Sequence, residues 1–125
     1  MPRGFWRALL TASMAAALAF SLRPLAPGQG PENWFAHSDK LLHVLFFAAL
    51  WGLGRRAGIT PPFALALGLL GFGIGIESAQ AALTHTREAS VLDLLADAAG
   101  IAVGWTVAVG VARLASRRQP QEHGR

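Results

Sequence analysis

The sequence has no cysteine and few charged residues. Without cysteine, the chain has no disulfide, iron–sulfur cluster, thiolate zinc site or cysteine nucleophile. Charged residues make up 14% of the 125 positions and hydrophobic residues 53%, whereas ordinary soluble domains carry about 25% charged residues. A soluble domain of this size needs more charge to cover its surface. The composition therefore excludes a disordered tail, a nucleic-acid-binding arm and a large soluble enzyme, and the length predicts one domain over residues 1–125.

Four apolar segments alternate with short polar breaks, at residues 5–22, 39–54, 61–83 and 91–114. A hydrocarbon core of about 30 Å needs about 17–25 helical residues, and the first two segments lie at the short end of that range. Backbone groups in lipid must bond within their own segment, so each segment is expected to be a helix. The pattern predicts an all-α polytopic membrane protein, a four-helix transmembrane bundle with a basic tail at 115–125. The first segment, which follows Arg3 and contains Arg7, also fits a secretory signal peptide.

The basic residues are distributed unevenly between the two sides that four spans would create. One side holds Arg3, Arg7, Arg55, Arg56, Arg113, Arg117, Arg118 and Arg125; the other holds Arg23, Lys40 and Arg87. Basic residues near helix ends favour the cytoplasm, so both termini are expected to be cytoplasmic. The basic tail is then a topology signal that also touches anionic lipid, and nucleic acid is not expected as a partner.

Polar residues that are costly in a membrane occur in three short blocks, and the predicted topology brings the blocks to the outer face. Ionisable groups in such positions usually face the bundle interior or a wet cavity. The candidate polar or ligand-binding cluster consists of Asp39, Lys40, His43, Glu77, Gln80, Arg87, Asp93 and Asp97. Several members also have a purely structural interpretation: Asp39 at a helix dipole, Asp93 in a capping box, His43 in packing and Arg87 as a counter-ion.

Two glycine pairs are spaced for close helix packing. Gly100 and Gly104 form a small-xxx-small pair below Asp93 and Asp97, and Gly71 and Gly75 form another pair on the preceding segment. Small residues at this spacing let neighbouring helices approach closely. Both pairs are therefore expected to lie at helix contacts that hold the polar cluster together.

The polar blocks resemble the VanZ-like family of small bacterial membrane proteins. The family's usual order is D-K-x-x-H, E-x-x-Q, R, then D-x-x-x-N-x-x-G-x-x-x-G, and the match runs from Asp39 to Gly104, about half the chain. One departure is Asp97, which stands where the family usually has Asn. The resemblance implies a protein of the bacterial inner membrane and cell envelope, in a family named for a protein linked to resistance to the glycopeptide teicoplanin.

Three functions are consistent with these residues. The favoured one is an accessory binding protein for envelope lipids, lipid-linked wall precursors or glycopeptide, since Lys40, His43, Gln80 and Arg87 offer donors at headgroup depth. An enzyme is less favoured, because the chain lacks H-E-x-x-H and G-x-S-x-G motifs. The third is a proton-coupled transporter with Glu77, Asp97 and His43 as a proton relay, which would need a dimer. We therefore assign no catalytic residue, cofactor or metal, and expect membrane lipids and a second copy of the chain as partners.

Overall fold

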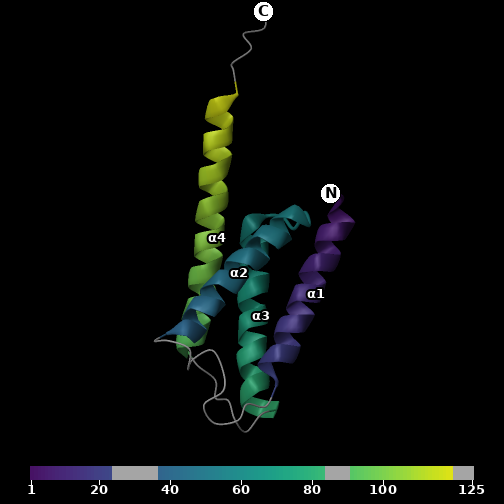
Figure 1. Cartoon of the computed structure of the whole chain (residues 1–125), viewed down its shortest axis with the longest axis vertical. Coiled ribbons are helices and arrows are strands. Elements are labelled where there is room, and N and C mark those ends of the chain that lie inside the picture. The colour runs from purple at the N-terminus through teal and green to yellow at the C-terminus, as the bar shows by residue number, and fades with distance from the viewer. Residues whose placement is uncertain (24–36, 84–90, 120–125) are drawn as a thin grey trace, which may run out of the picture.

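The computed structural model describes residues 1–23, 37–83 and 91–119, and within these ranges it contains four helices and no strand. The helices are α1 (Arg3–Ser21), α2 (Ser38–Arg56), α3 (Pro62–Leu83) and α4 (Val91–Arg118). Successive helices run in opposite directions, and the C-terminal part of α4 extends beyond the other three (Figure 1). The predicted all-α class and the four helical segments are confirmed, with α4 four residues longer than expected.

Helix α2 lies at the centre of the bundle, because it contacts α1, α3 and α4. Its side chains Phe47, Leu50 and Trp51 are completely buried and form the core with apolar residues of the other helices. Leu10 comes from α1, Leu65 and Leu69 from α3, and Ile101 from α4. Trp51 also stacks on Trp105, with ring centroids 4.9 Å apart and planes 16° from parallel.

The outer surface of the bundle is apolar. Leu45, Phe63 and Val107 are 57%, 63% and 58% exposed, and water would oppose so much exposed apolar surface. Three of the helices, α1, α3 and α4, are long and apolar enough to cross a membrane. Helix α2 is not among them, because its 19 residues include two charged residues near each end.

The turn between α2 and α3 follows the proline and glycine pattern of the sequence. Helix α2 ends before Gly58, whose φ of +85° is readily adopted only by glycine. Helix α3 then begins at Pro62, one residue after a cis Thr60–Pro61 bond. Proline suits the first turn of a helix, because the amide hydrogen that it lacks would have no helical partner there.

Only one of the two predicted glycine pairs lies at a helix contact. Gly100 and Gly104 do pack closely on α2, next to Val44 and Trp51. The expectation for Gly71 and Gly75 is wrong, since a Cβ at either position would meet nothing within 4 Å. Gly73 lies at the contact instead, because it shares the inner face of α3 with the buried residues Leu69, Ile76, Glu77 and Gln80.

Candidate functional site

Two helix N-termini place polar side chains together at one end of the bundle. Asp39, Lys40 and His43 lie in the first two turns of α2, and Asp93 and Asp97 lie in the first two turns of α4. Residues four apart share a helix face. These faces meet because α4 approaches α2 closely at Gly100, where an added Cβ would be 2.4 Å from the Val44 carbonyl oxygen. We call this group, together with Glu77 of α3, the acidic-end cluster.

Lys40 joins the two helices through its ammonium group. Its Nζ bonds the carboxylate of Asp39 and lies 2.5 Å from Oδ1 of Asp93 on α4. The three side chains are between 17% and 27% exposed. Hydrogen bonds between ionised groups are stronger than neutral ones, so the ammonium cross-links the start of α2 to the start of α4.

His43, which is partly exposed, bonds the buried carboxyl group of Asp97. His43 Nδ1 and Asp97 Oδ1 share a hydrogen bond of 2.5 Å, and Asp97 is only 1% exposed. The other oxygen of Asp97 lies against α3 at Gly73, where an added Cβ would be 2.6 Å away. Gly73 therefore leaves the space that the carboxyl group occupies, a role that the glycine spacing in the sequence does not reveal.

Glu77 brings a third helix to the cluster. Glu77 is buried on α3, and one ligand atom from each of Glu77, His43 and Asp93 lies within 4.8 Å of the others. His43 Nε2 is 3.8 Å from Asp93 Oδ2, which is longer than a hydrogen bond. Imidazole and carboxylate atoms at such separations suit a divalent cation. Metal-bound histidines also usually bond a carboxylate through their second nitrogen, as His43 bonds Asp97.

Of the two remaining predicted members, one bonds the end of α1 and the other lies outside the described residues. Gln80 is buried, and its Nε2 donates a 3.0 Å hydrogen bond to the carbonyl oxygen of Ser21, which ties α3 to the end of α1. Arg87 lies outside the described residues. The structure thus brings together Asp39, Lys40, His43, Glu77, Asp93 and Asp97.

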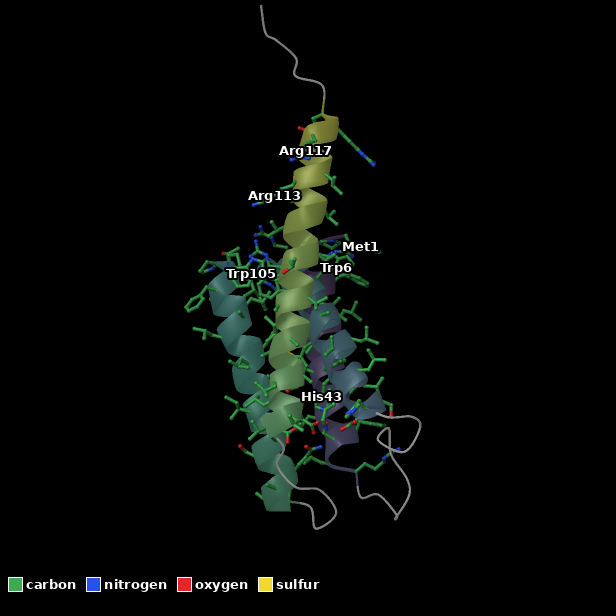
Figure 2. All side chains as sticks on the ribbon, turned by 90° about the vertical axis from the view of Figure 1, so that its left-hand side faces the viewer. Met1, Trp6, His43, Trp105, Arg113 and Arg117 are labelled. Atoms are coloured by element: carbon green, nitrogen blue, oxygen red, sulfur yellow. The ribbon has the colours of Figure 1, made fainter. Side chains whose placement is uncertain are left out.

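The opposite end of the bundle is basic. Figure 2 shows Met1, Trp6 and Trp105 at the end away from His43, with Arg113 and Arg117 beyond them. Among the described residues, this end holds seven arginines and no carboxylate: Arg3, Arg7, Arg55, Arg56, Arg113, Arg117 and Arg118. We call it the arginine end.

Several of these arginines hold the turn between α2 and α3. Arg7 Nε donates a 3.2 Å hydrogen bond to the carbonyl oxygen of Ala57, and Arg55 donates a 2.9 Å bond to that of Ile59. The Arg56 guanidinium lies 4.8 Å from the centre of the Trp6 ring, within the range of a cation–π contact. The arginine end therefore has a structural role as well as a strong positive charge.

No family model, curated protein or solved structure matches the chain. The site is therefore interpreted from its own geometry. That geometry is a partly exposed histidine bonded to a buried carboxylate, beside a lysine bridge at one end of an apolar helix bundle.

Proposed function

We propose that the chain is a VanZ-like protein of the bacterial inner membrane that crosses the membrane four times. Helices α1, α3 and α4 are long and apolar enough to span. Two observations support α2 as the fourth span. It contacts each of the other three helices, and His43 is its only ionisable residue between Lys40 and Arg55.

The charge distribution supports an orientation with both termini in the cytoplasm. The arginine end carries the N-terminus of α1 and the C-terminus of α4, and the acidic-end cluster lies at the other end. Since basic residues favour the cytoplasmic side, the cluster would face outwards.

Single cysteines test this topology directly, since the chain has none of its own. We expect Gly4→Cys and Ser116→Cys to react with a membrane-impermeant maleimide only after the cytoplasmic side is exposed. Leu83→Cys should react in intact cells. If α2 does not cross, Gly4 and Ser116 would be labelled from opposite sides.

We further propose that the acidic-end cluster binds the polar headgroup of an envelope lipid or a lipid-linked wall precursor. The observation that carries this proposal is the convergence of ionisable side chains from α2, α3 and α4 at one end of an apolar bundle. Such residues are costly in a membrane and usually mark a functional site. Between the two ends, the described part of the bundle has no ionisable side chain, so a transport path has no support.

The bonding within the cluster indicates what kind of headgroup it favours. Lys40 and His43 are the groups that could donate hydrogen bonds to a phosphate, but both are already bonded to carboxylates. Asp39, Glu77, Asp93 and Asp97 outnumber these two cationic groups. Carboxylates only accept hydrogen bonds when ionised, so ammonium or hydroxyl groups are the favoured ligand chemistry.

Expression in a teicoplanin-susceptible bacterium tests this function. We expect the chain to change teicoplanin susceptibility or envelope lipid composition, and His43→Ala and Glu77→Gln to remove the effect. Arg117→Gln, at the opposite end, should retain it and serves as the control. The proposal fails if both cluster variants, at matched membrane levels, act like the parent chain.

A second candidate is a cation-dependent activity on lipid-linked substrates, favoured by the convergence of His43, Glu77 and Asp93 within 4.8 Å. Thermal unfolding of the purified chain with Zn²⁺, Mg²⁺ or Ca²⁺ tests it. A bound cation raises the unfolding midpoint by mass action, and His43→Gln should abolish the rise. The absence of a rise with all three ions would exclude this candidate.

A further inference from the structure

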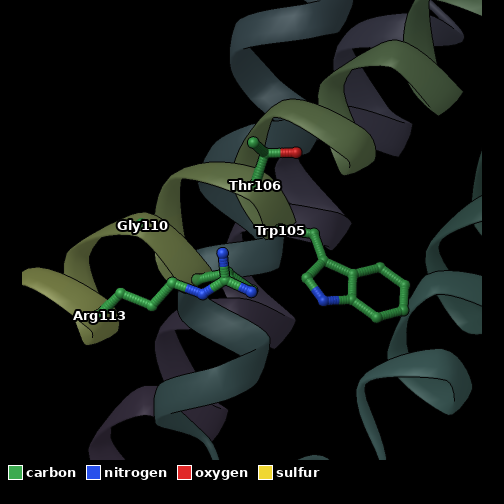
Figure 3. A pocket seen from close by; sticks show the side chains of 5 residues that line it. Trp105, Thr106, Gly110 and Arg113 are labelled. Atoms are coloured by element: carbon green, nitrogen blue, oxygen red, sulfur yellow. The ribbon is translucent and has the colours of Figure 1, made fainter.

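The outer face of α4 has a groove near the arginine end. Its volume is about 490 Å³, and it is lined by Trp105, Thr106, Val109, Gly110 and Arg113. The side chain of Arg113 extends back along α4 towards Trp105 (Figure 3). The groove thus combines an apolar wall with a cation at one end.

The charge of this region favours an anionic occupant. The guanidinium of Arg113 forms no hydrogen bond or ion pair with any side chain in the described ranges. The other six arginines of the same end add to the positive field. All residues that line the groove belong to α4, and basic residues at the cytoplasmic surface of a membrane attract anionic lipid headgroups.

The depth of the groove fits a phospholipid. Arg113 is 20 residues after Asp93 on the same helix, and a rise of 1.5 Å per residue separates them by about 30 Å. That distance equals the hydrocarbon thickness of a typical bilayer, about 30 Å. With the acidic-end cluster at one headgroup layer, Arg113 is at the other, while Val109 and Trp105 lie at the depth of acyl chains.

We propose that this groove binds one anionic phospholipid, with its phosphate on Arg113 and an acyl chain along Val109, Gly110 and Trp105. Gly110 keeps the groove open, since a Cβ at that position would meet nothing within 4 Å. A larger side chain would therefore fill the groove without disturbing helix contacts. The proposal requires the bundle to lie in a bilayer, but it is independent of the ligand proposed for the acidic-end cluster.

Native mass spectrometry of the full-length protein in neutral detergent tests the proposal with phosphatidylglycerol and phosphatidylcholine as probes. We expect Arg113→Gln to weaken phosphatidylglycerol binding about fivefold, the factor for about 1 kcal/mol per basic residue near an anionic surface. Arg117→Gln removes the same charge one turn farther along α4 and should weaken binding clearly less, because Arg117 does not line the groove. Gly110→Leu should weaken binding and Gly68→Leu should not, since Gly68 is equally open but lies on α3.

Equal losses in Arg113→Gln and Arg117→Gln would overturn the proposal, because they would indicate attraction to general surface charge. Unchanged binding in Gly110→Leu would also overturn it, and so would equal binding of phosphatidylcholine. Competition by glycerol 3-phosphate at the same concentration as the lipid would overturn it as well, because a free anion would then occupy the site without an acyl chain. Helix content from circular dichroism confirms that each variant is folded. The cluster variant His43→Ala should bind phosphatidylglycerol normally, which separates this result from the function of the other end.

Discussion

Replacing Gly100 with alanine tests whether close contact between α2 and α4 holds the polar cluster together. A Cβ at Gly100 would lie 2.4 Å from the carbonyl oxygen of Val44 and 2.9 Å from Cβ of Phe47. Carbon–oxygen contacts of this kind normally span about 3.3–3.6 Å. The nearest atom belongs to the backbone and cannot rotate away, so the two helices must separate by about 1 Å, the difference between these distances.

The expected loss of stability is the difference between a packing cost and a gain in helix propensity. Inserting an extra carbon into a packed contact typically costs about 1–3 kcal/mol, and the rigid backbone contact places Gly100→Ala in the upper part of that range. Alanine recovers about 1 kcal/mol because it favours the helix more than glycine does. We therefore expect a net loss of about 1–2 kcal/mol in the free energy of unfolding.

The same displacement should reach the cluster. His43 and Asp97 are 2.5 Å apart across this interface, and a separation of about 1 Å would take them beyond hydrogen-bond distance. Gly100→Ala should therefore impair any activity that depends on the cluster, although Gly100 is not part of it.

Unfolding of the purified chain by sodium dodecyl sulfate in mixed micelles, followed by circular dichroism, measures the effect. Gly71→Ala is the matched control, because its Cβ would meet nothing within 4 Å. The control should gain about 0.5–1 kcal/mol, the helix penalty of glycine. If Gly100→Ala is as stable as Gly71→Ala, the close approach of α4 to α2 is not what stabilises the bundle.

Three further predictions use the same unfolding measurement. Asp97→Ala should cost about 1–3 kcal/mol, because it removes the hydrogen-bond partner of the partly exposed His43 ring, whereas Asp97→Asn should cost less than about 1 kcal/mol because the amide can still bond; the prediction fails if the two variants lose the same free energy. A double-mutant cycle of Lys40→Met and Asp93→Asn should give a coupling of about 1 kcal/mol that falls with added salt, and zero coupling at low salt would contradict the bridge between α2 and α4. Trp51→Ala should cost about 3–5 kcal/mol because the side chain is completely buried, and a loss below about 1 kcal/mol would show that the core is elsewhere.

The positions of the helices could be predicted from the sequence because long apolar runs and proline–glycine breaks are local signals. The end of α4 could not, because the strongly apolar run that predicts the helix ends at Leu114. The helix continues to Arg118 through alanine, serine and arginine, and alanine and arginine favour helices whether or not they are buried. In helix α2, by contrast, the sequence pattern predicts more than the composition supports. Its apolar middle indicates a span, but the charges at its ends exclude it from the three helices that qualify by composition.

The side of a helix that packs against its neighbours could be predicted only where the helix has one polar stripe. The predicted topology brings the blocks of Asp39 and His43 and of Asp93 and Asp97 to one face, and because the residues of each pair are four apart they share a helix side; the structure brings the two pairs together. Helix α3 is apolar on nearly all sides before Glu77, so the inward face of Gly73 is indicated only by its position four residues before Glu77. The partners of Lys40 and the stacking of Trp51 on Trp105 depend on three-dimensional contacts that no spacing encodes.

The short distance between the charges of α2 has a consequence for the lipid around the protein. Lys40 and Arg55 are 15 residues apart, about 22 Å along the helix axis at 1.5 Å per residue, while Leu41 and Leu45 beside this charged end are exposed. A surrounding bilayer of ordinary thickness would have to thin locally at α2, or the lysine and arginine stems would have to reach outwards. Proteins with such hydrophobic mismatch sort towards thinner or more compliant membrane regions. If α2 spans the membrane as proposed, the bilayer is thinner beside α2 than beside α4, where Asp93 and Arg113 are about 30 Å apart.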